Sequence, residues 1–497
     1  MENAVLIKRR FRTTHKKTCV LSLCLVCAFT GCLTSGGSDK GKIAVERTAD
    51  STLSDEVVAL TQALIRSRPV NPPGQEHVVT DILARYLEQH NIAVELDTFE
   101  DDGRVNLMAR VPGTDPALKP LVLVGHSDVV PAKAEDWSEP GSPFEAKVEN
   151  GILYGRGSLD MLSMVAMETL VLVHISRLER APARDLILLV VGDEEVDGLG
   201  MQAALKKWPR LLRAQWAINE GAYLLQDYFT PGEDIAAVSV AQKGVLQFRL
   251  TTSGEAGHGS SPSPDDAPVR LARAVNRIID RPNPMTFTPE SKRMFKMLGQ
   301  ARGGLNGIVM GTPFLLKRLG KKSISNSKTT SALVHNTCAL TMVDAGYKRN
   351  VIPAEATATF DCRLLPGTAP SDFRDTLLGL VDDPRVKFET LMEGAANGSP
   401  GESKVIDVIR ARINAEFPQT ATVPILTKGL TDSRFLREKG IPCYGFIPIR
   451  VTPEELESLH GRDERVRVEE LKAGLLRLID ISQALLEFKP QSTQGPR

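Results

Sequence analysis

The chain of 497 residues lacks the composition of a nucleic-acid-binding protein. Its 61 lysines and arginines are balanced by 61 aspartates and glutamates, so there is no net positive charge to attract phosphates. Aromatic residues make up only 5% of the sequence, which disfavours surfaces on which bases stack. We therefore expect no nucleic acid among its partners.

Cysteine is scarce as well, with seven residues in the whole chain. Four of them fall within the first 32 residues, so only Cys338, Cys362 and Cys443 remain in the body of the protein. Three thiols are too few for a framework of disulfides. Cys338 and Cys362 lie in strand-like segments and could pair in an oxidising compartment, but buried free thiols are the simpler interpretation, which we favour.

The N-terminus has an apolar run, from Cys19 to Thr30, that is too short to span a membrane comfortably. Basic residues precede it, and it ends in Phe29-Thr-Gly-Cys32, followed by a Ser/Gly-rich stretch. This arrangement resembles a bacterial lipoprotein signal, in which cleavage before the cysteine leaves a lipidated residue. We therefore predict a signal over residues 1–32, lipidation of Cys32 and a linker over residues 33–51.

This signal also predicts where the protein is found. Leu33, rather than an aspartate, follows the cysteine, which favours an outer-membrane lipoprotein that faces the periplasm. Contact with the membrane is expected only through the N-terminal lipid. A soluble periplasmic or secreted protein is the alternative.

The remaining length exceeds one ordinary hydrophobic core and indicates more than one structural unit. Apolar residues recur at helical spacing between residues 52 and 92, on either side of the turn from Arg68 to Gly74. Strands then alternate with helices as far as about Ile218, which is typical of a mostly parallel sheet in an α/β fold. We assign residues 52–242 to the first part of this domain and residues 393–490 to its second part.

Residues 243–392 have a different order of elements. Strand-like and helical segments follow one another in a βαββαβ-like order, of which three strands, near 247–251, 338–344 and 356–363, and two helices, near 268–280 and 372–381, can be located. This order predicts an inserted α+β domain of the ferredoxin-like kind. Residues 283–334 interrupt it and are predicted to be irregular, partly because of Gly303-Gly304.

Acidic residues and a histidine follow three apolar runs of the α/β region. Leu121–Val124 leads to His126 and Asp128, Leu186–Val191 leads to Glu194 and Glu195, and Trp216–Ile218 leads to Glu220. In open α/β sheets ligands bind beyond the carboxyl ends of the strands, so these side chains should meet at one sheet edge. Histidines combined with several carboxylates suit a pair of divalent metal ions.

Each of these signals is weak on its own. His126 and Asp128 project to the same side of a strand, but such pairs are usually structural. Asp160 sits in a glycine-rich turn before a helix, where an N-cap is the simplest role. Adjacent Glu194 and Glu195 repel each other unless a cation offsets them, although a solvated acidic loop is the alternative. His460, in a loop far along the chain, carries no weight by itself.

Taken together, the motifs resemble the di-zinc peptidases and amidohydrolases that include aminoacylase, carnosinase and carboxypeptidase S. The resemblance covers about residues 52–488 and is strongest to the branch of carboxypeptidase S and secreted N-acyl amino acid hydrolases. The segments that carry it are Gly125-His-Ser-Asp-Val-Val-Pro131, Tyr154-Gly-Arg-Gly-Ser-Leu-Asp160, Gly192-Asp-Glu-Glu195, Asn219-Glu-Gly221, Gly257-His-Gly-Ser-Ser-Pro262, Asn350-Val-Ile-Pro353 and His460-Gly461.

The resemblance implies a zinc-peptidase-type catalytic domain and two Zn²⁺ ions per chain. Asp160 would bridge the two ions. His126 and Glu220 would complete one metal site, and Glu195 and His460 would complete the other. Glu194 would be the general base, and Asp128 would orient His126.

Further residues are implied by the same resemblance to act on the substrate. His258, in the inserted domain, would stabilise the oxyanion, often across a dimer, so a homodimer through this lid domain is expected. Asn350 and Arg363 would contact the substrate, as would Gly429 and Arg434 in a second loop. Relatives commonly have a lysine where this chain has Leu162, which is not a ligand position.

Three functions follow from these expectations. The first is a zinc carboxypeptidase or dipeptidase that acts on short peptides. The second is an N-acyl amino acid hydrolase, which cleaves the same kind of amide beside a free carboxylate and which the sequence does not separate from the first. The third is an inactive binding protein on this scaffold, which predicts a missing ligand or base, and none is missing.

Overall fold

The computed structural model describes residues 51–100, 103–138, 140–228 and 232–489. The predicted signal, Cys32 and all but the last residue of the predicted linker lie outside these ranges, so export and lipidation stay predictions. Within the described ranges, every helix is too short or too polar to traverse a bilayer.

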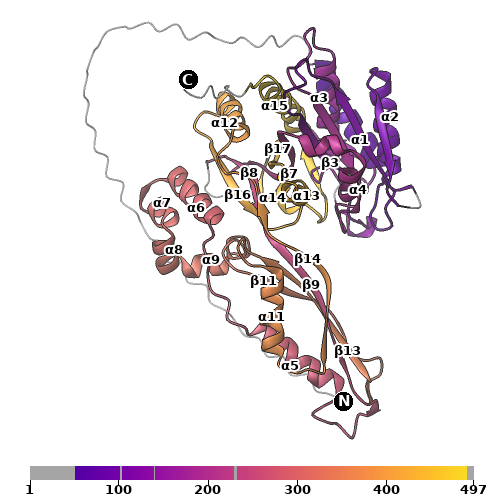
Figure 1. Cartoon of the computed structure of the whole chain (residues 1–497), viewed down its shortest axis with the longest axis vertical. Coiled ribbons are helices and arrows are strands. Elements are labelled where there is room, and N and C mark those ends of the chain that lie inside the picture. The colour runs from indigo at the N-terminus through magenta and orange to yellow at the C-terminus, as the bar shows by residue number, and fades with distance from the viewer. Residues whose placement is uncertain (1–50, 101–102, 139, 229–231, 490–497) are drawn as a thin grey trace, which may run out of the picture. The chain divides into compact units, whose positions relative to one another are not determined.

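A mixed sheet forms the centre of the larger domain. Among the described residues its strands follow the order β1-β2-β6-β3-β7-β17-β8-β15, and β16 pairs with β8. Figure 1 labels five of these strands, β3, β7, β8, β16 and β17. Strand β3 is parallel to β6 and β7, and β17 is parallel to β7, as the sequence predicted. The bounds are β1 Val94–Thr98, β2 Val105–Val111, β3 Leu121–His126, β6 Leu186–Val191, β7 Trp216–Leu225, β8 Ile235–Gln242, β15 Asn397–Gly398, β16 Ala421–Thr427 and β17 Cys443–Val451.

Both faces of this sheet are covered, which explains the unbroken apolar runs Leu121–Val124 of β3 and Leu186–Val191 of β6. In β3, Leu121 and Leu123 pack into the core on one face, while Val122 and Val124 pack into the core on the other. The first core is shared with α1 Ser51–Arg66, α2 His77–Gln89, α3 Leu162–Ser176, α12 Lys404–Glu416 and α15 Val468–Leu486, and the second with α4 Leu199–Lys207 and α13 Ser433–Glu438. Short elements complete the domain: β4 Lys147–Glu149, β5 Ile152–Tyr154, β18 Arg465–Arg467 and α14 Pro453–Glu457.

The inserted domain has the predicted ferredoxin-like order. Its four antiparallel strands lie in the order β11-β13-β9-β14, with α5 and α11 running along one face (Figure 1). Phe248 stacks on Phe360 and on Phe388, with ring centroids 5.1 Å and 4.3 Å apart. The bounds are β9 Gly244–Ser253, α5 Ala267–Ile279, β11 Thr337–Asp344, β13 Glu355–Leu364, α11 Pro370–Val381 and β14 Val386–Gly394, with a separate ribbon of β10 Gly257–His258 and β12 Val351–Ile352.

The prediction that residues 283–334 are irregular was wrong. The segment contains α6 Pro289–Arg302, α7 Gly304–Gly311, α8 Pro313–Leu319, α9 Lys321–Asn326 and α10 Lys328–Ala332. Thr288 caps α6 by accepting a hydrogen bond from the Ser291 backbone, and Pro289 occupies the first turn, both of which are ordinary signals for a helix start. Gly303 and Gly304, with φ of 64° and 58°, only form the turn between α6 and α7.

The expectation of free thiols was wrong for two of the three body cysteines. Cys338 and Cys362 face each other across β11 and β13 and form a disulfide. The sequence placed both residues in strands but carried no information on which residues would be opposed. Cys443 is free and buried, as expected.

Close packing between two central strands helps to position Glu220. Gly445 of β17 lies opposite Asn219 of β7. A Cβ atom at position 445 would lie 2.2 Å from the backbone oxygen of Glu220 and 2.8 Å from the Cβ of Ser239. Only glycine therefore allows β17 to approach β7 and β8 this closely.

We expect Gly445→Ala to lower the free energy of unfolding by about 1–3 kcal/mol, because the two strands must separate. Gly379→Ala is the matched control, since nothing lies within 4 Å of a Cβ at that position in α11. The control should instead be stabilised, by about 0.5–1 kcal/mol. Urea unfolding of both variants checks this, and equal stabilities would contradict the close approach.

Candidate functional site

Loops and strand ends bring the predicted site residues together. His126 ends β3, Glu194 and Glu195 follow β6, and Glu220 lies within β7. Asp160 precedes α3, and His460 lies in the loop after α14. The six side chains come from distant parts of the sequence, yet contacts link them into one cluster.

Asp160 lies between the two histidines. Its Oδ1 is 3.1 Å from Nε2 of His126, and its Oδ2 is 3.1 Å from Nε2 of His460. The same nitrogen of His460 is 3.2 Å from Oε1 of Glu195. One carboxylate therefore presents a separate oxygen to each imidazole, which is the geometry required of a ligand shared by two sites.

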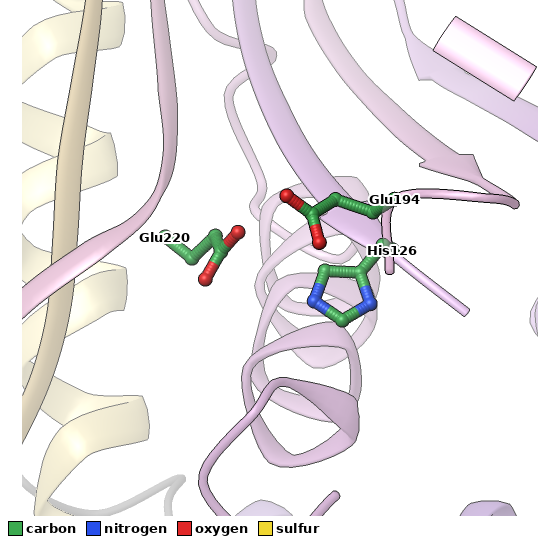
Figure 2. A group of neighbouring side chains, drawn as sticks. All are labelled: His126, Glu194 and Glu220. Carbon is green, nitrogen blue, oxygen red and sulfur yellow. The ribbon is translucent and has the colours of Figure 1, made fainter. Parts of the chain in front are cut away.

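Two overlapping groups of side chains are suited to holding a cation. In one, ligand atoms of His126, Glu194 and Glu220 all lie within 4.8 Å of one another, and in the other those of His126, Asp160 and Glu195 do. Figure 2 shows the carboxylates of Glu194 and Glu220 converging on the His126 ring from different segments of the chain. Ligand atoms of a tetrahedral zinc site are about 3.3 Å apart, given metal–ligand bonds near 2.0–2.1 Å, so the spacings around Asp160 fit such an ion.

The electrostatics of the cluster also favour a cation. Burial, together with the negative charge of Glu220, raises the pKa of Glu194 well above its ordinary value. Burial, together with the negative charge of Asp160, likewise raises the pKa of Glu220 well above its ordinary value. Burial alone would lower the pKa of His126, but the surrounding carboxylates, with Asp160 first, raise it well above the ordinary value. Four carboxylates face two imidazoles, and divalent ions would offset that excess of negative charge.

His460 is affected by the same excess of negative charge. Hydrogen bonds to Asp160 and Glu195 raise its pKa to about 10. Its backbone adopts the left-handed conformation, with φ of 54°, and so does that of Asp193 beside Glu194, with φ of 68°. Such conformations are uncommon for residues with a Cβ and persist where surrounding contacts impose them, often at functional sites.

Asp128 positions more than the histidine it was expected to orient. The Nδ1 atom of His126 is 2.9 Å from the backbone carbonyl of Asp128 and 3.7 Å from its carboxylate. The carboxylate oxygens instead accept hydrogen bonds from the backbone N–H groups of Glu194 and Glu195, at 3.2 Å and 3.1 Å. Asp128 therefore ties His126 and the Glu194-Glu195 loop to one another, and leaves Nε2 of His126 directed at Asp160.

A buried network below this loop was not identified from the sequence. Arg104 donates hydrogen bonds to Glu76 and Asp193, and Asn71 donates to both Asp193 and Asp128. Asp193 in turn accepts from the backbone of Leu199. These contacts fix the backbone just before Glu194, but no local sequence pattern links Asn71, Glu76 and Arg104 to it.

Glu464 holds the turn that carries Asp160, and it was also missed. The carboxylate is fully buried and accepts hydrogen bonds from the backbone of Gly157, Leu159 and Asp160 at 2.8–3.1 Å. It also pairs with Arg156 at 2.6 Å, and Arg156 donates to the backbone oxygen of Gly461. The segment that carries His460 thus also anchors the Asp160 turn, although Arg462-Asp463-Glu464 resembles an ordinary solvated charge run.

A cavity of about 780 Å³ opens beside the cluster. Of the predicted substrate residues, Arg363, Gly429 and Arg434 line it, together with Asp160, Glu194, Glu195, Glu220 and His460. Asp361 accepts hydrogen bonds from Nε and Nη2 of Arg363 at 2.7 Å and 2.9 Å. The Nη1 atom of Arg363 is buried and has no hydrogen-bond partner among the described residues.

Much of the remaining cavity wall is apolar. It is formed by side chains from both domains and from the helical segment 283–334, including Leu225, Tyr228, Met294, Leu333, Met392, Ile425, Leu426, Leu456 and Leu459. The cavity wall therefore combines polar groups, which are the carboxylate cluster and Arg363, with a largely hydrophobic surface.

His258 and Asn350 do not line this cavity. Both are exposed on or beside the ribbon of β10 and β12, where the Gly259 backbone donates to the carbonyl of Asn350. Nδ1 of His258 is 2.8 Å from Oγ of Ser260. Leu162, at the position where relatives commonly have lysine, is buried and lies over Gly157, so it packs against the turn that carries Asp160.

Comparisons with known proteins agree with this fold and site. Residues 122–483 match the profile of peptidase family M20/M25/M40. Human N-fatty-acyl-amino acid synthase/hydrolase PM20D1 is 31% identical over 386 residues, which are 75% of this chain and 75% of that protein. Probable carboxypeptidase S-like 2 of Dictyostelium discoideum is 29% identical over 373 residues, covering 72% and 70%.

Solved structures show the same architecture. The crystal structure of an M20 family metallo-carboxypeptidase from Sulfolobus solfataricus superposes with a TM-score of 0.69 at 17% identity, over 87% of this chain and all of the other. The fold is that of a metallopeptidase-type hydrolase. The chain belongs to peptidase family M20/M25/M40, which confirms the predicted family, fold class and enzyme class.

We expect Glu464→Gln to lower the free energy of unfolding by about 1–3 kcal/mol, because an amide cannot satisfy both Arg156 and three backbone N–H groups. Glu469→Gln is the control, since that side chain is 79% exposed and should change stability by less than about 0.5 kcal/mol. Denaturant unfolding measures both. If the two variants are equally stable, Glu464 does not hold the Asp160 turn.

Proposed function

We propose that this protein hydrolyses N-acyl amino acids with a hydrophobic acyl group and uses two divalent metal ions to do so. The observation that carries the proposal is the cavity, which joins the carboxylate cluster and Arg363 to a largely apolar wall. The similarity to a protein named N-fatty-acyl-amino acid synthase/hydrolase supports it.

Two zinc ions are the metals we propose, because imidazole nitrogens and carboxylate oxygens are suitable ligands for zinc. Asp160 would be shared, as its contacts with His126 and His460 support. Glu220 would complete the site of His126, and Glu195 the site of His460. When bound, such ions lower the pKa of a water molecule and polarise the scissile carbonyl.

Glu194 is the proposed general base. Burial and Glu220 raise its pKa, so this carboxylate accepts a proton more readily than an ordinary glutamate does. In hydrolysis it would take a proton from the attacking water and deliver it to the nitrogen of the leaving amino acid. Asp128, which accepts from the backbone N–H of Glu194, would keep the base in position.

Arg363 is the proposed clamp for the substrate carboxylate. Two of its nitrogens are held by Asp361, which leaves Nη1 buried at the cavity without a partner among the described residues. A carboxylate of the substrate would satisfy that donor. The acyl chain would then extend along the apolar wall near Met294, Leu333 and Ile425.

A carboxypeptidase or dipeptidase is the second candidate, because the same clamp would hold the C-terminal carboxylate of a peptide. The similarity to a carboxypeptidase S-like protein supports this candidate. The two functions differ in the side of the amide opposite the clamp, where a peptide presents a polar amine or backbone and an N-acyl amino acid presents a hydrocarbon.

His258 lies away from the cavity, so a second chain would have to bring it there unless the inserted domain moves. It is exposed and absent from the cavity wall of its own chain. We therefore propose a homodimer through the lid domain, in which His258 of one chain serves the site of the other. A single-chain mass in sedimentation equilibrium at assay concentrations would contradict this.

We expect kcat/KM to rise with acyl length in a series of N-acetyl, N-octanoyl and N-oleoyl derivatives of one amino acid, because each added methylene contributes roughly 0.8 kcal/mol when fully buried. A matched set of dipeptides with the same C-terminal residue completes the panel. Higher kcat/KM on the dipeptides than on every acyl derivative would favour the carboxypeptidase instead.

Two controls tie the measured activity to the proposed site. Chelation should abolish hydrolysis of every substrate in the panel. Glu194→Gln should retain the metals and lose kcat by roughly 10²–10⁴-fold or more, because the isosteric amide cannot transfer the proton. Activity that survives either change would arise elsewhere and would contradict the proposal.

A further inference from the structure

The helical segment of residues 289–322 differs in charge from the rest of the chain. It contains eight basic residues and one acidic residue, Glu290, whereas the whole chain has a formal net charge of zero. All eight basic side chains are exposed: Lys292, Arg293, Lys296, Arg302, Lys317, Arg318, Lys321 and Lys322. The positive charge is therefore concentrated on α6, α8 and α9 and is available to a partner.

The same segment also exposes large apolar side chains. Leu305 and Ile308 of α7 are 82% and 58% exposed, and Phe314 and Leu319 of α8 are 72% and 65% exposed. This exposure is not a consequence of poor packing, because other apolar residues of these helices are buried in the main core, including Met294, Phe295, Leu298 and Leu316. The segment thus packs one set of apolar side chains into the core and exposes a second set to solvent.

Basic and apolar side chains alternate at close range on α8 and at its end. Lys317 and Arg318 are three and four residues after Phe314, so they are its neighbours on the helix surface. Lys321 and Lys322 follow Leu319 at the start of α9. Long basic side chains beside apolar ones can lie at a water–hydrocarbon boundary with their charges directed to the polar side. We call these eight residues the basic apolar surface: Leu305, Ile308, Phe314, Leu319, Lys317, Arg318, Lys321 and Lys322.

We propose that the basic apolar surface docks on an anionic phospholipid membrane. Such a membrane offers both things that this surface lacks, which are hydrocarbon for the four apolar side chains and phosphate charge for the four basic ones. Binding of this kind is peripheral and does not involve a spanning helix, and it is separate from the predicted lipid on Cys32.

Docking would also bring the cavity close to a source of hydrophobic substrates. Met294 of α6 and Leu333, just after α10, line the cavity, so the segment that carries the basic apolar surface also forms part of the cavity wall. The proposal itself concerns membrane binding and does not rest on the proposed function. A failure to hydrolyse N-acyl amino acids would leave it unaffected.

Hydrogen–deuterium exchange of the full chain, with and without lipid vesicles, tests the proposal at the level of residues. We expect backbone amides of residues 304–322 to exchange more slowly with phosphatidylglycerol vesicles than with phosphatidylcholine vesicles. The difference should fall at high salt, because exposed charges are then screened. Localised exchange is needed because the basic residues near the N-terminus would also attract anionic lipid. Unchanged exchange in residues 304–322 would overturn the proposal.

Two variants separate the contributions of the surface. Combined Lys317→Glu, Arg318→Glu, Lys321→Glu and Lys322→Glu should reduce protection by anionic vesicles roughly tenfold or more. Combined Leu305→Ser, Ile308→Ser, Phe314→Ser and Leu319→Ser should abolish it without lowering Tm, because these side chains are exposed. The control, Leu378→Ser with Leu391→Ser, changes apolar residues that are 41% and 43% exposed on other elements and should leave protection intact.

The same exchange measurement on the wild-type protein also distinguishes binding to a membrane from binding to a second copy of the chain. Protection of residues 304–322 that depends on protein concentration, without vesicles, would assign the surface to self-association and overturn the proposal. Equal protection by neutral and anionic vesicles in the wild type would overturn it as well, because the basic residues would then have no part in binding.

Discussion

The contact on which the rest of the site depends is that of Asp160 with two histidines. Its two oxygens lie 3.1 Å from His126 and 3.1 Å from His460, which belong to segments more than 300 residues apart in the sequence. Glu464 accepts hydrogen bonds from the backbone N–H groups of Leu159 and Asp160 and so fixes the loop that carries this carboxylate. Burial of this turn, of Glu464 and of Arg156 together is what converts a flexible glycine-rich loop into a fixed support.

Placing four carboxylates close together lowers the stability of the folded protein, and the hydrogen-bond networks around the site compensate for this. Glu194, Glu195, Glu220 and Asp160 repel one another, and the raised pKa values of Glu194 and Glu220 reflect that repulsion and their burial. Networks behind the site hold the loops in place despite it: Asp128 binds the Glu194-Glu195 backbone, and Arg104 joins Glu76 to Asp193. Metal ions would remove the repulsion and would make the same geometry favourable.

The sequence predicted the parts of this site that follow from strand order. His126, Glu194 and Glu220 were found because each follows an apolar run that predicts a strand, and parallel strands place the ends of such runs together. In the structure β7 continues beyond its run, so Glu220 lies within that strand. Glu464 and Glu76 were missed because their roles arise from tertiary contacts with backbone groups and with Arg104, which no spacing reveals.

The disulfide between Cys338 and Cys362 depends on strand register, and that is set by packing across β11 and β13 rather than by either segment alone. The helices of residues 283–334 were missed although Thr288-Pro289 is a signal for a helix start. The paired glycines interrupt the segment, and its helices are too short to give a clear helical period in the sequence. His258 was correctly placed in the inserted domain, but its expected action at the cavity stays a prediction, because the side chain does not line the cavity of its own chain.

The central claim is that Asp160 is shared by two metal ions, and the metal content of purified variants tests it most directly. Elemental analysis and competition with a chelator should find two ions per chain in the active protein. Asp160→Ala should weaken the binding of both ions, while His460→Ala should weaken mainly one, since Asp160 contacts both histidines. Active protein that holds one ion, or an Asp160→Ala variant that retains one ion at wild-type affinity, would contradict the account.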